Sequence, residues 1–203
     1  MTELIAVALA FFVVAVSPGP ANLSNAAIAM AYGRRTSMIY GLGLSCGLVF
    51  WGLVAASGMG AVLQSSLYLL MALKVLGGLY LIWLAVQSAR SAMTPETEAV
   101  TASRGGRWFW RGLILNTSNP KSVIAWMAAL SIGLNPDDGF AAIVAATGVC
   151  IAVGFFNNAL YSVVFSTGGA MRLYRRARRG IDGVMAGLFA LAGLGLIRSA
   201  FAR

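Results

Sequence analysis

Long apolar stretches dominate this sequence and limit what it can fold into. Each is close to the about 20 residues that a helix needs to cross a hydrocarbon core of about 30 Å. Of the 203 residues, 59% are hydrophobic and 10% are charged, which is far from the composition of a soluble domain. The pattern predicts an all-α integral membrane protein with six transmembrane helices, at residues 4–30, 38–63, 67–89, 112–134, 140–165 and 181–197.

The basic residues are concentrated in alternate connections between these spans. The net charge is +9, and the arginines gather at residues 34–35, 90–111 and 172–179, whereas the connection after span two is uncharged and the one after span four carries only acids. Because cytoplasmic loops carry an excess of Lys and Arg, the basic connections are predicted to be cytoplasmic and both termini to lie outside. The positive charge thus indicates topology rather than nucleic-acid binding.

A polar segment at residues 91–107 divides the chain into two halves of three spans each. Its Pro, Ser, Thr and Gly residues are typical of a linker, here a cytoplasmic one. We expect one domain, with half one at residues 1–90 and half two at residues 108–203. Because each half has an odd number of spans, the second enters the membrane from the opposite side, as in a 3+3 inverted repeat. The first stretch is not expected to be a cleaved signal, because it begins with Glu3 and Pro18 follows its small-residue site.

A proline interrupts the first span of each half at a corresponding position. The motif SPGP begins at Ser17 and the motif NPK begins at Asn119, and the similar strings NLSN and NTSN lie beside them. Proline is favoured at the first position of a helix, and Ser or Asn just before it is a favoured N-cap. A helix is therefore predicted to restart at Pro18 and again at Pro120.

These restarts predict an anion site near the bilayer midplane. Each restart would place a helix N-terminus there, with about half an elementary positive charge, and the opposite directions of the two spans would make these ends face each other. Lys121 lies about ten residues after Arg111 and adds a full positive charge at this depth. Its burial costs on the order of 2.5–3.5 kcal/mol, which favours a functional role. A kink that only shapes packing and a snorkelling lysine are the simpler alternatives.

Few other polar residues lie deep in the apolar stretches. Lys74 lies in span three and Asn22 lies beside the first break; Asn157 and Asn158 are adjacent in span five. The two span-five residues either join helices by hydrogen bonds or line a substrate path. All six acids are predicted at the ends of spans or in loops, so no carboxylate relay crosses the membrane centre. The sequence has no His, and it offers no metal or hydrolase constellation.

These motifs resemble the lysine-exporter and homoserine/threonine-efflux type of small bacterial amino-acid exporters. SPGPAN from Ser17 resembles the PGP signature of that family, and residues 73–90 resemble its third-span pattern. FWRGLILNTSNPKSVIAWMAAL from Phe109 resembles its fourth-span NPK pattern, and the basic stretch that leads into residues 181–197 is similar to its last span. The resemblance covers nearly the whole chain.

The resemblance implies a transporter of the bacterial inner membrane rather than an enzyme, one that exports amino acids with the proton gradient and without a cofactor. Where family members often carry an acid in span five, this chain has Asn157, so nothing acidic is there to meet a cationic side chain. We therefore expect a small, uncharged amino acid, with its carboxylate on Lys121 and its ammonium group near Ser17 and Asn22. The positions that match the family motifs are Pro18, Gly19, Pro20, Lys74, Asn119, Pro120 and Lys121.

Three other functions fit parts of the sequence. They are a thiol relay between Cys46 and Cys150, a metal-ion exporter, and a structural membrane protein. The cysteines lie away from the breaks, deep acids and His are lacking, and a structural role does not explain two buried lysines. The expected partners are the amino-acid substrate and the lipid bilayer, without nucleic acid. Glycines at helical spacing, namely Gly43 and Gly47 or Gly183 and Gly187, would permit close helix packing and leave a homodimer open.

Overall fold

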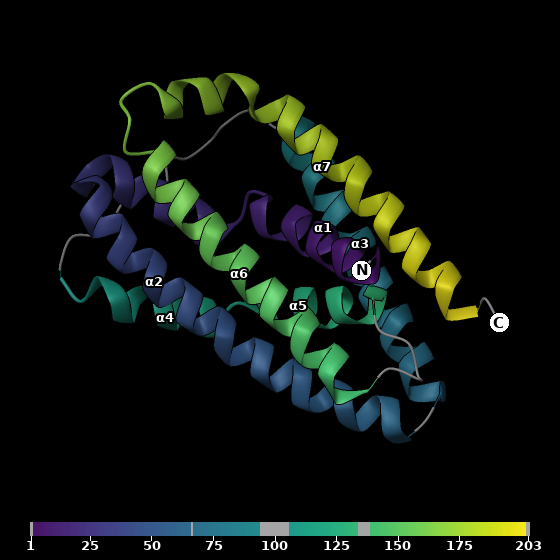
Figure 1. Ribbon diagram of the computed structural model, residues 1–203. Helices are drawn as coiled ribbons and strands as arrows, with labels where there is room; N and C mark the ends of the chain where they lie inside the picture. Colours follow the sequence, from purple (N-terminus) through teal and green to yellow (C-terminus); the bar gives the residue numbers. More distant parts are fainter. Residues whose placement is uncertain (1, 66, 94–105, 134–138, 202–203) are drawn as a thin grey trace.

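The described part of the chain is an all-α bundle. The computed structural model describes residues 2–65, 67–93, 106–133 and 139–201, and within them it contains no strand. The central part of the predicted linker, residues 94–105, lies outside the described residues. The helices are α1 (Thr2–Val16), α2 (Pro20–Ser65), α3 (Leu67–Met93), α4 (Trp108–Thr117), α5 (Pro120–Gly133), α6 (Phe140–Val164) and α7 (Ala170–Phe201) (Figure 1).

A sharp turn at Gly33 divides α2 into two parts that belong to different spans. Gly33 has φ 81° and ψ 171°, a backbone conformation that is open essentially to glycine alone. The part before Gly33 completes the span that α1 begins, and the part after it is span two. The arginines that follow this turn at Arg34 and Arg35 are exposed, as expected for a connection outside the membrane.

The helix lengths agree with six spans. In the described residues, three helical segments are long and apolar enough to cross a membrane, namely Pro20–Gly58, Phe140–Val164 and Arg172–Phe201. At about 1.5 Å per residue, the 27 residues of α3 also exceed the thickness of the hydrocarbon core. The remaining two spans are the broken ones, where α1 joins the start of α2 and α4 joins α5.

The two halves repeat the same order with opposite direction. Each half has one broken span followed by two continuous ones. In Figure 1 the first span runs from right to left whereas α4 and α5 run from left to right, and α6 and α7 likewise oppose the second part of α2 and α3. The bend within α2 and the starts of α4 and α7 lie toward one end of the bundle in Figure 1, and both termini lie toward the other. The predicted inverted repeat is confirmed.

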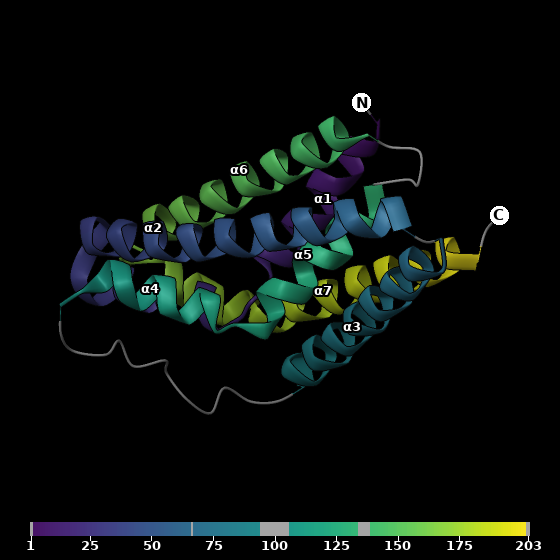
Figure 2. The ribbon, with the colours of Figure 1, turned by 90° about the horizontal axis from the view of Figure 1, so that it is seen from below.

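The halves interlock rather than packing as separate bodies. Helix α2 packs along α4 and α6, and α3 packs along α7, so the most extensive contacts join one half to the other. The bundle therefore has one group of α2, α4 and α6 and a second group of α3 and α7, which Figure 2 shows on different sides. The apolar helices α1 and α5 lie between these groups and supply core residues such as Phe11, Trp126 and Leu130.

Of the two glycine pairs predicted to permit close helix packing, one lies at a helix contact and the other does not. A Cβ atom on Gly43 would collide with the backbone oxygen of Phe109, and one on Gly47 would lie 2.9 Å from the Cβ of Asn116. The prediction for this pair is confirmed at the crossing of α2 and α4. The prediction for Gly183 and Gly187 is wrong, because both are exposed and nothing lies within 4 Å of where their Cβ atoms would be.

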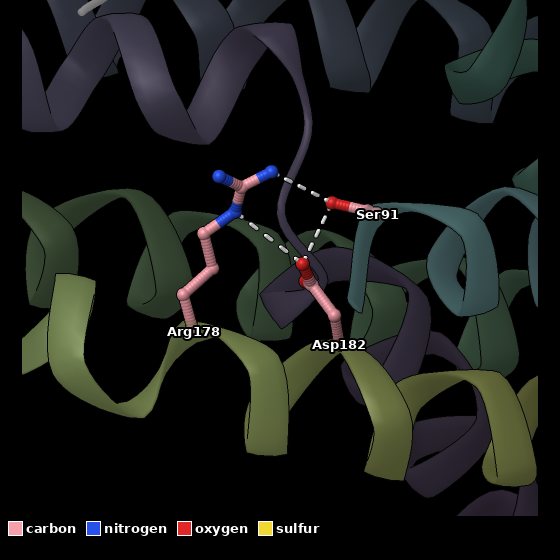
Figure 3. Close-up of polar contacts among 3 residues, drawn as sticks. All are labelled: Ser91, Arg178 and Asp182. Atoms are coloured by element: carbon pink, nitrogen blue, oxygen red, sulfur yellow. Dashed lines mark hydrogen bonds and ion pairs between the residues drawn. The ribbon is translucent and has the colours of Figure 1, made fainter. Parts of the chain in front are cut away.

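A buried carboxylate ties α3 to α7 near the basic end. Asp182 is buried, and its Oδ2 accepts a hydrogen bond of 2.7 Å from Ser91 Oγ and lies 3.5 Å from Arg178 Nε (Figure 3). Arg178 also donates to Ser91 Oγ over 3.0 Å. The acid is therefore paired and hydrogen-bonded, as a buried charge must be. This cluster joins half one to half two.

Candidate functional site

The two proline breaks meet in the interior of the bundle. Lys121, at the start of α5, donates from Nζ to the hydroxyl of Ser17, which follows the last residue of α1. A Cβ atom on Gly19 would lie 3.2 Å from the same Nζ, so the ammonium group lies directly over the first break. The two motifs are 104 positions apart in the chain, and the inverted repeat brings them into contact.

After the first break the helix restarts two residues later than the sequence predicts. The new helix begins at Pro20 and not at Pro18. The amide of Leu23 donates to the carbonyl of Gly19 over 2.9 Å, which is the first bond of the new helix. Ser17 is therefore not its N-cap, and this prediction is wrong. The hydroxyl of Ser17 instead donates back to the carbonyl of Val14 over 2.8 Å and satisfies the end of α1.

The second break restarts as predicted. Helix α5 begins at Pro120, and Asn119 Oδ1 accepts a hydrogen bond of 3.1 Å from the amide of Lys121, the N-cap arrangement expected of Asn before Pro. Asn116 holds the end of α4 in place, because it donates to the carbonyl of Leu44 in α2 and accepts from Ser122 Oγ. The positive end of α5 is thus fixed beside the lysine side chain.

The carbonyl groups at the end of α1 already accept hydrogen bonds. Asn22 Nδ2 donates to the carbonyls of Ala15 and Ser17 over 2.6 and 2.9 Å, and Tyr161 donates from its hydroxyl to the carbonyl of Val16 over 3.0 Å. These bonds satisfy groups that a helix end would otherwise leave open. The negative end of α1 is also a favourable place for a cation, which helps to hold the ammonium group of Lys121.

Asn157 is oriented by this arrangement. Both acceptors near Asn22 Nδ2 are carbonyls, so the side-chain oxygen of Asn22 must face a donor, and Asn157 Nδ2 supplies it over 3.1 Å. In the part of the chain that the structure describes, the other end of that amide, Asn157 Oδ1, is buried and has no hydrogen-bond partner. The same holds for Trp126 Nε1 in α5, whose ring is fully buried.

These groups surround one small cavity of about 70 Å³. That volume exceeds the roughly 10–15 Å³ that one water requires on this measure, and it admits a small solute. Seven of the ten predicted site residues line it: Ser17, Gly19, Pro20, Asn22, Asn119, Lys121 and Asn157. Pro18 lies at the first break without lining the cavity, Pro120 begins α5, and Lys74 lies half-buried on α3 outside the cavity.

The sequence alone did not identify several residues of the cavity. Asn116 and Ser122 hold the second break, and Phe11, Ala125 and Trp126 form apolar walls. Trp126 resembles any core aromatic residue in a membrane helix, and no spacing distinguishes it. Its missing hydrogen bond is a property of the packed structure.

Asn158 belongs to a different polar cluster, which joins the first, second and fifth spans. Asn25 Nδ2 donates to the carbonyl of Asn158 over 2.9 Å, and Ser37 Oγ donates to Asn25 Oδ1 over 2.7 Å. Ser162 Oγ lies 2.8 Å from Ser37 Oγ, and Asn158 Nδ2 donates to Ser45 Oγ over 2.9 Å. All five residues are buried. Asn158 also lines the cavity, so its hydrogen bonds support the helix-joining role while its position keeps the substrate path open as the second.

The rival constellations find no support in the described residues. Cys46 and Cys150 are both free, and Cys150 packs in the apolar core. Neither cysteine lines the cavity. Within the part of the chain that the structure describes, no group of three or more His, Cys, Asp or Glu residues could hold a metal ion.

Comparison with known proteins agrees with the resemblance in the motifs. The model of the LysE type translocator family matches residues 12–200. The chain is 31% identical to the threonine efflux protein of Salmonella typhimurium over 201 residues, which cover 95% of this chain and 96% of that protein. It is 35% identical over 116 residues to the homoserine/homoserine lactone efflux protein of the same organism, which cover 56% and 55% of the two chains. No solved structure gives a significant match.

Proposed function

Since the chain belongs to the LysE type translocator family, and is thus a membrane transporter rather than an enzyme, we propose that it exports small, uncharged amino acids. Relatives that match nearly the whole chain are named threonine efflux proteins, which makes threonine the first candidate, and homoserine is the second. The observation that carries the proposal is the contact of Lys121 with Ser17 between the two proline breaks, beside the cavity.

Lys121 and the start of α5 together suit a carboxylate. The ammonium group supplies a full charge, and the first turn of α5 supplies the positive end of a helix dipole. In the present arrangement the ammonium group donates to a neutral hydroxyl, that of Ser17. An incoming carboxylate is a stronger acceptor for the same donor because the bond is then charge-assisted on both sides. Substrate binding would thus exchange one partner of Lys121 for another.

Among the described residues no carboxylate lines the cavity, which favours a substrate with a neutral side chain. The polar lining of the cavity consists of hydroxyl, amide and ammonium groups, and Asn157 stands where the family resemblance leads one to expect an acid. A cationic side chain would meet the charge of Lys121 without compensation in a low-dielectric interior. The proton gradient is the energy source that we propose, since export against a concentration gradient requires one.

Alternating access would move the two helix groups rather than the two halves. The halves interlock through α2 with α4 and α6 and through α3 with α7. We therefore replace the expected rocking of one half against the other by a motion of α1, α5 and the α3 and α7 pair relative to the α2, α4 and α6 group. The cavity lies on the boundary of this motion, because its described lining comes from α1 and α5 on one side and from α2, α4 and α6 on the other.

The test of the carboxylate site compares two lysines. Inside-out vesicles with an imposed proton gradient are supplied with radiolabelled threonine, homoserine, valine and lysine. Lys121→Ala should lower the uptake of the preferred amino acid at least about 30-fold, since truncating one partner of a buried charged contact costs about 2–5 kcal/mol. Lys74→Ala is the matched control, because this lysine lies outside the cavity, and it should retain transport.

Two outcomes would contradict the proposal. The carboxylate site is lost if Lys121→Ala transports as well as the unchanged protein at equal abundance in the membrane. The assignment as an amino-acid exporter is lost if the unchanged protein moves no amino acid of the panel.

We further propose that the basic end faces the cytoplasm of the bacterium and that both termini lie outside, as the distribution of arginines predicts. Thr167, between α6 and α7, and Gly139, just before α6, are exposed positions that this topology places on opposite sides. With Cys46 and Cys150 replaced by alanine, Gly139→Cys should react with an impermeant thiol reagent in intact cells, and Thr167→Cys only in inside-out vesicles. The reverse pattern would invert the topology.

A further inference from the structure

Two residues that line the cavity each carry a buried polar atom without a hydrogen-bond partner among the described residues, and the two atoms are of opposite kind. Trp126 Nε1 can only donate a hydrogen bond, and Asn157 Oδ1 can only accept one. Trp126 is 0% exposed and Asn157 is 3% exposed. Buried Trp N–H groups usually find a partner, and leaving one unmade forfeits the hydration of the group. Both residues line the same cavity as Lys121.

Neither atom can turn away to find a partner elsewhere. Asn157 is held by Asn22, whose own amide is fixed by two carbonyl groups. The indole of Trp126 packs 4.8 Å from the ring of Phe11, and a Cβ atom on Gly52 would lie 2.6 Å from its Cζ2 atom. The donor and the acceptor are therefore held in place by packing before any substrate enters, which is how a binding site gains selectivity.

The pair matches a hydroxyl group better than either charged end of an amino acid. A carboxylate would satisfy Trp126 and leave Asn157 unpaired, and an ammonium group would do the reverse. A hydroxyl donates once and accepts at the same oxygen, so it can satisfy both. The carboxylate of the substrate already has its own partner at Lys121, on the same helix as Trp126.

We propose that Trp126 and Asn157 form a subsite that selects amino acids with a side-chain hydroxyl, Trp126 donating to the oxygen and Asn157 accepting from the O–H. This inference rests on the proposed function, since it assigns the side-chain end of the same site. A site built to bond a hydroxyl rejects an analogue that lacks it, because its own buried groups are then left unpaired. Threonine and valine are the matched pair, because they differ by a hydroxyl in place of a methyl group.

The experiment measures threonine and valine uptake in inside-out vesicles for Trp126→Phe and the unchanged protein. The unchanged protein should prefer threonine at least about tenfold, and Trp126→Phe should reduce that preference about tenfold while valine uptake is kept. Trp51→Phe is the control, because Trp51 Nε1 already donates to the carbonyl of Thr117 over 3.0 Å outside the cavity. This variant should leave the threonine-to-valine ratio unchanged.

A second variant keeps the test valid if Trp126→Phe does not reach the membrane. Asn157→Leu removes the acceptor from another helix and should reduce the same ratio. An unchanged ratio in the folded variants, with transport intact, overturns the hydroxyl subsite and leaves the exporter proposal standing. A complete lack of amino-acid transport by the unchanged protein overturns both, so the two failures can be told apart.

Discussion

Asn157 and Asn158 are neighbours on α6, but they differ in their hydrogen bonds. Both are buried, at 3% and 7% exposure. Asn158 joins a cluster in which Asn25, Ser37 and Ser162 bond to one another across three spans. Asn157 Nδ2 donates to Asn22 Oδ1, whereas Asn157 Oδ1 has no hydrogen-bond partner in the described part of the chain. Two adjacent asparagines therefore differ in role: Asn158 helps to join three spans, and Asn157 keeps one acceptor without a bond.

This difference separates buried polar groups that hold helices together from buried polar groups that line the cavity. A buried acceptor without a partner costs about 1–3 kcal/mol, and the neighbouring cluster shows that buried amide and hydroxyl groups in this bundle do bond across helices. Of the three buried side-chain atoms without a partner in the described residues, Trp126 Nε1 and Asn157 Oδ1 belong to residues that line the cavity, and Thr147 Oγ1 does not. The two atoms at the cavity are the ones that the proposed hydroxyl subsite uses.

The largest expected effect on stability comes from a substitution in the polar cluster of Asn25, Ser37, Ser45, Asn158 and Ser162. Asn25→Leu removes the side-chain hydrogen bonds of Asn25 to the Asn158 carbonyl, the Ser37 hydroxyl and the Ser162 hydroxyl at once. The loss should lower the free energy of unfolding by about 3 kcal/mol, because several buried polar groups lose their bonds together. In thermal unfolding of the detergent-purified protein this corresponds to a Tm about 6–12 °C lower. An unchanged Tm would mean that this cluster does not hold the spans together.

Much of the frame of the molecule could be predicted from the sequence. Apolar runs and charged connections gave the spans, and the odd number of spans per half gave the inverted repeat. The contact between the SPGP and NPK motifs followed from that topology, and Lys121 was recognised as a costly charge at depth. These features depend on local composition and chain direction, which a sequence displays directly.

What could not be predicted depends on tertiary packing. Whether the first helix restarts at Pro18 or Pro20 depends on how Ser17 bonds, and its hydroxyl turned back to Val14. No sequence pattern predicts that α3 pairs with α7. Nor does one predict that the indole N–H of Trp126 has no partner among the described residues. A glycine pair such as Gly183 and Gly187 has the spacing of a packing face whether or not a helix lies against it.

The smallest expected effect on stability comes from the same substitution at the neighbouring site. Asn157→Leu eliminates an unpaired acceptor but also takes the donor away from Asn22 Oδ1. The two changes are of similar size and opposite sign, so the free energy of unfolding should stay within about 0.5 kcal/mol and Tm within about 2 °C. Measured beside Asn25→Leu under the same conditions, this pair holds the chemistry of the substitution constant and varies only its place. If Asn157→Leu destabilises the protein as much as Asn25→Leu does, Asn157 is a structural amide like its partners in the cluster, and the distinction between a saturated and an open polar region fails.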